Sequence, residues 1–230
     1  MNRAYVTCHM SMSLDGRIDG NFHDAPCSEK AGRYYYDIIF ELGTSMAGGR
    51  TTTQMYSPQP DIDYSKYSDA NVAYDDNIIR NPNGNYCFIY DRKGKCNWNS
   101  PTTAMNGVTM QVVEVLTKQV RKEYLAHLKA IGVAYIFAGD TELSVETSLV
   151  KMKELLGVSH LVLTGGAEIN GGFLNEGMID EFSIVLQPYV EGNSNLKSLV
   201  DTHKTFNDTA FKFAEAKPLD DGAVHLIFRK

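Results

Sequence analysis

Short apolar runs alternate with amphipathic segments along most of this chain, and no other feature constrains its fold as strongly. The run YCFIY at 86–90 is followed by MQVVEVL at 110–116, and a helical apolar spacing then extends over 117–132. The same order, an apolar run followed by a helical pattern, recurs at 133–157 and at 159–177. Strands that alternate with helices are typical of a largely parallel sheet with helices on its faces. The sequence therefore predicts an α/β fold, with a mixed, mostly parallel sheet in a three-layer α/β/α arrangement.

The two ends of the chain extend this expected sheet. Residues 4–13 have the pattern of a buried strand that ends at a turn, and 28–43 has that of an amphipathic helix. The tail at 211–219 and 223–230 predicts an antiparallel hairpin, which gives the sheet a mixed edge. No repeat or linker divides the sequence, so we expect a single domain over 1–230.

Boundary signals refine these elements. Gly43 is a plausible C-cap of the first helix, and the strand expected at 44–49 opens into a helix at 50–56. We expect Thr51 or Thr52 near the N-cap of that second helix, because hydroxyl side chains accept hydrogen bonds from free N–H groups.

Residues 57–85 are the least regular part of the sequence. Prolines, an Asn83-Gly84 pair and many Asp and Tyr residues mark a long loop or lobe. Loops of this length are often functional, and a surface insertion is the alternative. Both interpretations stay open from the sequence.

Composition limits the partners of the chain. The formal net charge is −6 and the two signs of charge are interspersed, so no basic face indicates a nucleic-acid partner. No apolar run approaches the roughly 20 residues of a membrane span, and the N-terminus lacks the pattern of a signal peptide. The four cysteines form no C-x-x-C pair, and Cys8 and Cys87 lie in apolar strand-like runs that favour buried free thiols. We expect a cytoplasmic protein.

Glycine pairs stand at two predicted strand-to-helix turns, where open α/β sheets bind ligands. Gly165 and Gly166 precede a helix whose first residues include Glu168 and Asn170. Bare glycine backbone at a helix N-terminus favours a phosphate, although tight strand-to-helix packing explains glycines equally well. The spacing is not G-x-G-x-x-G, so the dinucleotide fingerprint is not met.

The second turn carries Gly48, Gly49, Arg50 and Thr51, which add a cation and a hydroxyl to the glycines. An exposed arginine at the start of a helix is common and needs no ligand. Two such turns in one sheet nevertheless favour a ligand with two phosphates more than either turn does alone.

A third strand end has the sequence YDRKGK, in which Arg92, Lys93 and Lys95 follow the buried strand 86–90. A solvated turn explains these cations. The alternative is a clamp for a phosphate monoester, such as the 2′-phosphate that distinguishes NADP from NAD.

Other chemistries lack their motifs. The sequence has no H-x-E followed by P-C-x-x-C, no G-x-S-x-G elbow and no Walker A loop, which argues against a zinc deaminase, an α/β-hydrolase and a P-loop enzyme. His9, His160 and His225 have the surroundings of strand residues rather than of metal ligands, and we expect no metal site.

Two segments together resemble a known family. VTCHMSMSLDGRIDG at 6–20 and LVLTGGAEINGGFLNEGMIDEFSIVLQPYVEG at 161–192 are similar to the reductase domain of the bacterial riboflavin-biosynthesis protein, a member of the dihydrofolate-reductase-like superfamily. The resemblance extends from about Ala4 to the last expected strand and leaves out 57–85. It implies an NADPH-dependent reductase that is usually a homodimer.

The resemblance also implies roles for individual residues. Ser11 falls where the first strand approaches the nicotinamide, and Arg92 falls where the 2′-phosphate binds. Gly48 to Thr51 fall on the turn that faces the cofactor, and Gly166 to Gly171 fall on the segment that surrounds the pyrophosphate. The residues expected to bind the cofactor are Ser11, Gly48, Gly49, Arg50, Thr51, Arg92, Gly165, Gly166, Ala167, Glu168, Ile169, Asn170 and Gly171.

The substrate residues differ from the family pattern. Thr164 stands where riboflavin-pathway members carry a glutamate before the glycine pair, and Ile39 and Phe40 stand where they carry an arginine. The resemblance implies substrate contacts from Ser13, Thr164 and, as a substitute cation, Arg33. The substrate is expected to be a small heterocyclic or ribosylaminopyrimidine-type compound.

Reduction also needs a proton. Asp15 is the acid in a matching motif near the expected pocket, and it is the candidate catalytic residue, although an aspartate before Gly16 also suits a structural role in the turn. A bound water is an equally good proton source. The altered substrate positions motivate a second hypothesis, a catalytically silent nucleotide-binding dimer of the same fold.

Overall fold

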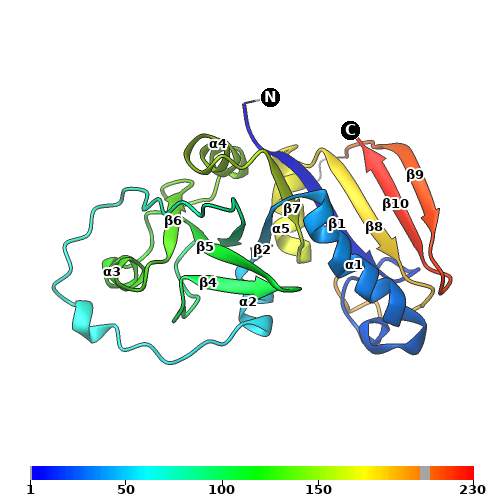
Figure 1. Cartoon of the computed structure of the whole chain (residues 1–230), viewed down its shortest axis with the longest axis horizontal. Helices are drawn as coiled ribbons and strands as arrows, with labels where there is room; N and C mark the ends of the chain where they lie inside the picture. Colours follow the sequence, from blue (N-terminus) through cyan, green and yellow to red (C-terminus); the bar gives the residue numbers. More distant parts are fainter. Residues whose placement is uncertain (1, 203–207) are drawn as a thin grey trace. The chain divides into compact units, whose positions relative to one another are not determined.

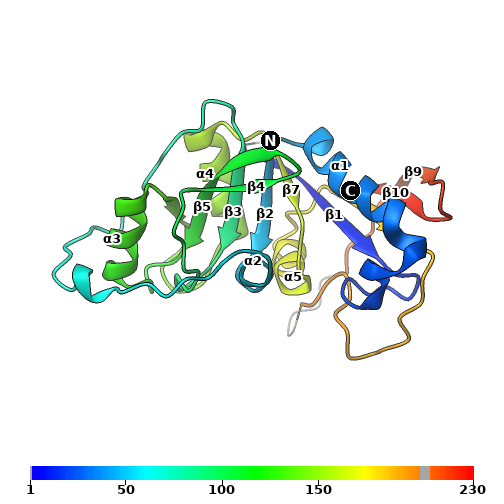
Figure 2. The same ribbon diagram turned by 60° about the horizontal axis from the view of Figure 1, so that its bottom comes forward.

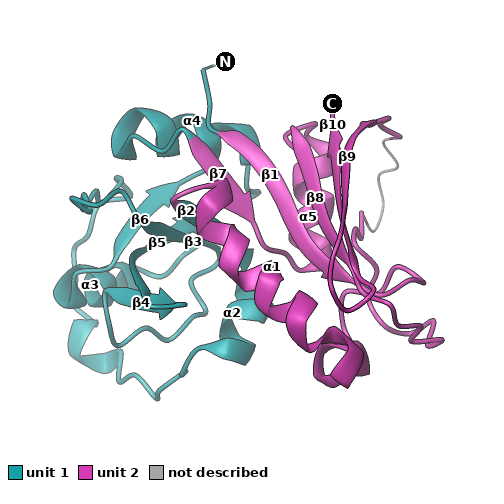
Figure 3. Ribbon diagram, turned by 45° about the vertical axis from the view of Figure 1, so that its right-hand side comes forward, with its two compact units in different colours: residues 1–4, 45–159 teal, residues 5–44, 160–230 magenta. Residues whose placement is uncertain are grey.

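The structure is a computed structural model that describes residues 2–202 and 208–230. The chain forms two compact units, coloured separately in Figure 3. The first unit comprises Ser45–Ser159 together with the N-terminal residues to Ala4, and the second comprises Tyr5–Thr44 and His160–Lys230. The single domain expected over 1–230 stays a prediction, and each unit is described by itself.

The first unit is built on parallel strands. β2 (Ser45–Gly49), β3 (Tyr86–Tyr90) and β5 (Val108–Leu116) are parallel and lie side by side in Figure 2. β6 (Ala134–Phe137) pairs in parallel with the second half of β5, and β4 (Thr102–Met105) pairs antiparallel with its first half. The parallel strands are almost wholly buried, which is why they appear in the sequence as continuous apolar runs.

Three α-helices belong to this unit. α2 (Arg50–Tyr56) packs against β2 and β3, and α4 (Val145–Leu156) packs against β6. α3 (Lys122–Ile131) ends at Gly132, whose φ of 75° gives the left-handed C-cap that glycine favours. α3 also packs against a short 3₁₀ helix at Ser65–Tyr67, written η3 in chain order.

The irregular segment 57–85 is tied to this unit along its length. Asn77 forms a bridge with Tyr135 on β6, with N–H to carbonyl distances of 2.9 and 3.0 Å between their backbones. Tyr64 and Tyr67 pack their rings on His127 of α3, and the cyan trace passes outside that helix in Figure 2. The segment therefore covers the outer edge of β6, where unpaired backbone groups would otherwise face water.

The second unit has a mixed sheet. β1 (Tyr5–Met12) lies between two parallel neighbours, β7 (His160–Leu163) and β8 (Glu181–Leu186). β10 (Val224–Arg229) is antiparallel to β8, and β9 (Lys212–Pro218) is antiparallel to β10 (Figure 1). The C-terminal hairpin predicted from the sequence is thus confirmed.

The helices of this unit follow from amphipathic spacing. α1 (Glu29–Leu42) buries Ala31, Ile38 and Ile39 and packs against β1 and β7. α5 (Ala167–Asn175) follows β7 directly. Two 3₁₀ turns, η1 (Asn21–Asp24) and η2 (Pro26–Ser28), lead into α1.

A chain of hydrogen bonds joins α1 to the sheet through buried polar groups. His9 Nε2 lies 2.9 Å from the Tyr35 carbonyl, which can only accept, so this ring nitrogen carries the proton. Burial lowers the pKa of His9 to about 4, so the ring is neutral and its Nδ1 accepts from the Ser183 hydroxyl at 2.8 Å. Ser183 in turn accepts from His225 Nε2 at 2.7 Å, and His225 Nδ1 accepts from the Tyr34 hydroxyl at 3.0 Å. The donor and the acceptor are therefore assigned for each hydrogen bond of this series.

Several boundaries differ from the sequence predictions. β4 was not predicted, and α3 begins at Lys122 rather than near 117, because the Thr117 side chain binds the Arg92 carbonyl in a turn. The N-cap of α2 is Gly49, and Thr51 and Thr52, which were expected near the N-cap, lie in the first turn without capping the helix. Gly43 is the C-cap of α1 as predicted, with extended backbone at φ −171°. Among the residues that the structure describes, no helix is long and apolar enough to cross a membrane.

Candidate functional site

The carboxyl ends of β2, β3 and β5 form one edge of the first unit. Gly48 and Gly49 end β2, Asp91 and Arg92 follow β3, and Thr117 follows β5. The Thr117 N–H and hydroxyl both donate to the Arg92 carbonyl, at 3.1 and 2.8 Å, which joins the last two strand ends. This edge brings together the predicted residues of the first unit, and parallel sheets bind ligands at such an edge.

Arg50 is a half-buried cation at this edge. Its Nη1 donates to Gln54 Oε1 at 2.5 Å, and Gln54 Nε2 donates to the Lys95 carbonyl at 3.0 Å. Within residues 2–202 and 208–230, Arg50 therefore has an amide partner and no carboxylate. Thr51, which follows it, is exposed. A fixed guanidinium with an uncompensated charge suits an anionic ligand.

Arg92 has an acidic partner instead. Its Nη1 lies 2.5 Å from Glu142 Oε2, and the side chains are 41% and 78% exposed. An ion pair this exposed contributes little to stability, so a phosphate can replace Glu142 as the partner of Arg92. Lys93 and Lys95, the other cations of this turn, are exposed.

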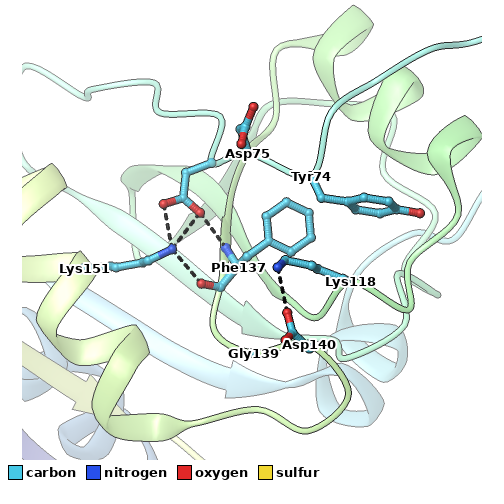
Figure 4. Close-up of a pocket in the computed structure, with 8 residues that line it drawn as sticks. Tyr74, Asp75, Lys118, Phe137, Gly139, Asp140 and Lys151 are labelled. Atoms are coloured by element: carbon cyan, nitrogen blue, oxygen red, sulfur yellow. Dashed lines mark hydrogen bonds and ion pairs between the residues drawn. The ribbon is translucent and has the colours of Figure 1, made fainter.

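A cavity of about 330 Å³ lies near the ends of β5 and β6 (Figure 4). Its two lysines are paired with aspartates: Lys151 Nζ lies 2.8 Å from Asp76 Oδ2, and Lys118 Nζ lies 2.7 Å from Asp140 Oδ1. Asp76 also accepts the Phe137 N–H at 2.8 Å, and Lys151 donates to the Phe137 carbonyl at 2.8 Å. These contacts anchor the end of β6 to the segment 57–85, and they pair both lysines of the lining with aspartates.

Beneath the carboxyl ends of β3 and β5 lies a buried cluster of two acidic side chains and a cysteine, which the sequence did not predict. Asp91, Cys96 and Glu114 are 2%, 0% and 0% exposed, and each offers an oxygen or sulfur atom within 4.8 Å of the other two. Burial, and then the nearby Asp91 carboxylate, raise the pKa of Glu114 well above its usual range. The signal that could have identified it is a lone carboxylate within the apolar run VVEVL.

The second unit holds the glycine-rich turn between β7 and α5. Gly166 occupies the N-cap of α5, and the peptide bond between Gly165 and Gly166 is cis. Gly166 has no side chain to cap the helix, so the first N–H groups of α5 keep the partial positive charge of a helix N-terminus. The arrangement suits a phosphate next to Ala167, Glu168 and Ile169.

Backbone conformation explains one glycine of this segment, and packing explains another. Gly165 has a φ of +90°, which side chains rarely adopt, and a Cβ at Gly171 would lie 2.0 Å from the Asp201 carbonyl oxygen. The next residue, Gly172, has open space at the corresponding position. Asn170, also predicted to bind the cofactor, is fully buried and donates from Nδ2 to the Leu199 carbonyl at 2.9 Å.

Asp15 holds a turn in the second unit. Its carboxylate accepts from the Ser13 hydroxyl at 2.7 Å and from the N–H groups of Glu191 and Gly192 at 3.0 and 2.9 Å. These hydrogen bonds, that of Ser13 first, lower the pKa of Asp15 to about 2. A carboxylate of this kind has no proton to donate at neutral pH, so the contacts favour the structural alternative for Asp15.

The remaining predicted residues of this unit differ in their burial and in their hydrogen-bond partners. Ser11 is buried and its hydroxyl oxygen accepts from Gln187 Nε2 at 3.0 Å. Arg33 lies on the exposed side of α1 and pairs with Glu29 at 2.5 Å, and Thr164 is half-buried after β7. The roles assigned to Ser11, Ser13, Arg33 and Thr164 stay predictions.

Comparison with known proteins decides the family. A family model described as the RibD C-terminal domain matches residues 4–225. The chain belongs to this family. The resemblance inferred from the sequence motifs and the α/β fold class are thereby confirmed.

Individual relatives of this RibD-family chain are distant. The 2,5-diamino-6-ribosylamino-4(3H)-pyrimidinone 5′-phosphate reductase of Aquifex aeolicus (strain VF5) is 23% identical over 215 residues, which cover 87% of this chain and 84% of the relative. Among solved structures, Acinetobacter baumannii RibD (form 2) has a TM-score of 0.65 at 18% identity and covers the whole of this chain. A pyrimidine reductase-like protein from Corynebacterium diphtheriae has a TM-score of 0.69 at 11% identity, with 99% of this chain and 92% of that one covered. This chain spans 58% of the length of the A. baumannii RibD chain.

Proposed function

We propose that this chain is an NADPH-dependent reductase that transfers a hydride to a ribosylaminopyrimidine-type 5′-phosphate. The observation that carries the proposal is the family match over residues 4–225, since it spans almost the whole chain. The Aquifex aeolicus relative is named as a reductase of such a compound. The chain is accordingly an oxidoreductase of the riboflavin-biosynthesis type, and its cofactor is a nicotinamide nucleotide.

The residues present fit such a cofactor. Arg50 is a fixed cation with no acidic partner in the described part of the chain, and the α5 N-terminus follows a glycine N-cap. In the first unit, Arg50, with Gly48, Gly49 and Thr51 beside it, would hold a phosphate group, and Arg92 would take the 2′-phosphate of NADPH from its exposed pairing with Glu142. The assignment of the segment from Gly166 to Gly171 to the pyrophosphate rests on the family resemblance. When bound, NADPH supplies the hydride.

Asp15 supplies orientation rather than a proton. The Asp15 carboxylate fixes the turn after β1 by accepting two backbone N–H groups and the Ser13 hydroxyl. The proton that completes the reduction then comes from water. Thr164, in the place of the family's glutamate, would contact the substrate through a neutral hydroxyl.

The direct test is oxidation of NADPH by the purified protein, followed by loss of NADPH absorbance. The substrates to offer are 2,5-diamino-6-ribosylamino-4(3H)-pyrimidinone 5′-phosphate and its uracil counterpart, 5-amino-6-(5-phosphoribosylamino)uracil. Turnover of either supports the reductase. Tight NADPH binding with no oxidation on both substrates would contradict it and favour the silent nucleotide-binding dimer.

Arg92 gives a sharper test of the cofactor. In Arg92→Ala we expect KM for NADPH to rise about tenfold, because a hydrogen bond to a charged group contributes about 1.5–3 kcal/mol and Glu142 already competes for the guanidinium. KM for NADH should stay unchanged, and so should both values in the control Lys93→Ala, which removes an exposed neighbouring cation. Equal losses for NADPH and NADH would remove Arg92 from the 2′-phosphate site.

We further propose, on the family resemblance alone, that the protein is a cytoplasmic homodimer. Sedimentation equilibrium at several protein concentrations tests the dimer. A single species with the mass of one chain would contradict it.

A further inference from the structure

The cluster of Asp91, Cys96 and Glu114 contains two buried carboxyl groups, and neither forms an ion pair with a described side chain. The atoms that these residues offer lie within 4.8 Å of one another. Two carboxylates this close and this deeply buried cannot both be ionised, because each loses its hydration and repels the other. One of them must be neutral, and their hydrogen bonds identify which.

Asp91 has the contacts of a charged carboxylate. Its Oδ2 accepts from the N–H of Cys96 at 2.7 Å and also from the N–H of Lys95. Its backbone carbonyl accepts the Gly94 N–H at 3.0 Å. Two backbone N–H groups donate to one carboxyl oxygen of Asp91, so Asp91 has the contacts of an acceptor-only carboxylate.

Glu114 has the contacts of a neutral acid. Its Oε1 accepts from the indole N–H of Trp98, and its Oε2 has no partner among the described residues. The hydroxyl of Tyr124 donates to the Cys96 carbonyl at 2.9 Å, so that proton is already in use. An unpartnered carboxylate oxygen in a fully buried site is costly, whereas a neutral carboxyl group at the same place has no charge to desolvate.

We propose that Glu114 is a neutral carboxylic acid in the folded protein and acts as a positioning residue for the cofactor-binding edge. Its proton leaves Asp91 as the single buried charge, and Asp91 then holds the turn 91–96 in place. The link to the cofactor rests on the function proposed above. The protonation of Glu114 does not.

The connection from Glu114 to the edge is continuous. Asp91 binds the Lys95 N–H, the Lys95 carbonyl accepts from Gln54 Nε2 at 3.0 Å, and Gln54 Oε1 accepts from Arg50. A charged Glu114 would repel Asp91 and loosen the first of these contacts. Arg50 would then lose the orientation in which it faces the proposed phosphate.

Neighbouring groups support a raised pKa for Glu114. The titratable groups around it are Cys87, Asp91, Cys96, Tyr64 and Tyr124, with Tyr135 paired to it in register on β6. Each of these is neutral or negative, and Arg50 acts on Cys96 from outside the cluster. Because the folded-state pKa lies above the unfolded value, the folded chain holds the extra proton, and stability falls as pH rises above the usual glutamate range.

The test compares two variants of the full chain. Glu114→Gln is isosteric with the neutral acid, keeps an acceptor for Trp98 and adds an N–H donor in place of the carboxyl O–H. Glu114→Ala removes all of these groups. Thermal unfolding from about pH 5 to about pH 8 and KM for NADPH are measured for both, and infrared difference spectra are recorded for the protonated carboxyl C=O band.

The expected results separate positioning from simple packing. Glu114→Gln should keep wild-type KM for NADPH, lose the carboxyl band and show a flatter fall of melting temperature with pH than wild type. Glu114→Ala should raise KM for NADPH several-fold while kcat changes little. If no variant oxidises NADPH but the band and the pH effect are present, the proposed function fails and the neutral acid stands.

Two results would overturn the proposal. One is a Glu114→Gln protein that is as unstable as Glu114→Ala and keeps the wild-type pH dependence, which would require an ionised Glu114. The other is a divalent metal ion that purified wild type retains through dialysis and Glu114→Gln does not. A cation, rather than a proton, would then compensate the two carboxylates.

Discussion

Gly171 and Gly172 are adjacent in α5, yet alanine should have opposite effects at the two positions. At Gly172 a Cβ meets nothing within 4 Å, so Gly172→Ala should stabilise the protein by about 0.5–1 kcal/mol through helix propensity. At Gly171 a Cβ would lie 2.0 Å from the carbonyl oxygen and 2.6 Å from the carbonyl carbon of Asp201. These are backbone atoms, which cannot rotate away as a side chain does.

The size of the Gly171→Ala effect follows from what has to move. Overpacking of this kind costs about 1–3 kcal/mol. The displaced segment also makes two hydrogen bonds with α5, from the Asp201 N–H to the Ala167 carbonyl at 2.9 Å and from Asn170 Nδ2 to the Leu199 carbonyl at 2.9 Å. Losing them costs about 0.5–1.5 kcal/mol each, and the helix-propensity gain of about 1 kcal/mol offsets part of this total. We expect a net loss of about 1–5 kcal/mol.

Urea unfolding followed by far-ultraviolet circular dichroism measures both changes, and a thermal-shift titration with NADPH accompanies it. Each variant serves as the control for the other, since the substitution and the helix are the same. Unfolding midpoints that move in the same direction would refute the packing argument. A Gly171→Ala protein with wild-type stability and lost NADPH binding would show instead that this glycine makes room for the cofactor.

Two further predictions concern buried and exposed polar groups of the second unit. Ser183→Ala leaves His9 Nδ1 and His225 Nε2 without their shared partner, so it should lower the free energy of unfolding in urea by about 2–4 kcal/mol. The control Ser198→Ala, at an exposed serine, should change this free energy by less than about 0.5 kcal/mol. Similar losses in both variants would contradict the assigned series of hydrogen bonds. The lowered folded-state pKa of Asp15 stabilises the protein above the usual aspartate range, and this stabilisation is lost as pH falls through about 2. Asp15→Asn should remove this part of the pH dependence of stability, and it should leave kcat at neutral pH unchanged. A large fall in kcat with an intact fold would restore Asp15 as a catalytic group.

Apolar periodicity predicted most helices and strands, because the side chains that each element buries recur along the sequence at the spacing of that element. β3 and β5 are continuous apolar runs since both of their faces are covered. β4 escaped prediction because its residues alternate between exposed and half-buried, and Thr102–Met105 contains no apolar run. The start of α3 was placed too early because Val120 fits the helical spacing, while Thr117 is held in a turn by the Arg92 carbonyl.

The candidate site was less accessible to sequence reasoning. The glycine pairs marked the right strand ends, but whether a glycine serves a ligand or a neighbouring backbone depends on segments distant in sequence, as Asp201 shows for Gly171. Glu114 looks like an ordinary strand residue until Trp98 and the turn at Asp91 are placed against it. Local patterns cannot indicate such contacts, because they form only when separate elements pack together.

The distribution of the two units along the chain determines the order in which strands can pair during synthesis at the ribosome. Almost all of the first unit lies in one continuous stretch, Ser45–Ser159, so its strands can pair as soon as that stretch has emerged. β1 is made earlier, but both of its neighbours, β7 and β8, come after that stretch. At about 5–20 residues per second, the nascent chain must carry an apolar strand without partners for many seconds. A circular permutant that begins at Ser45 would remove this delay, and its yield of soluble protein without chaperones measures what the natural order costs.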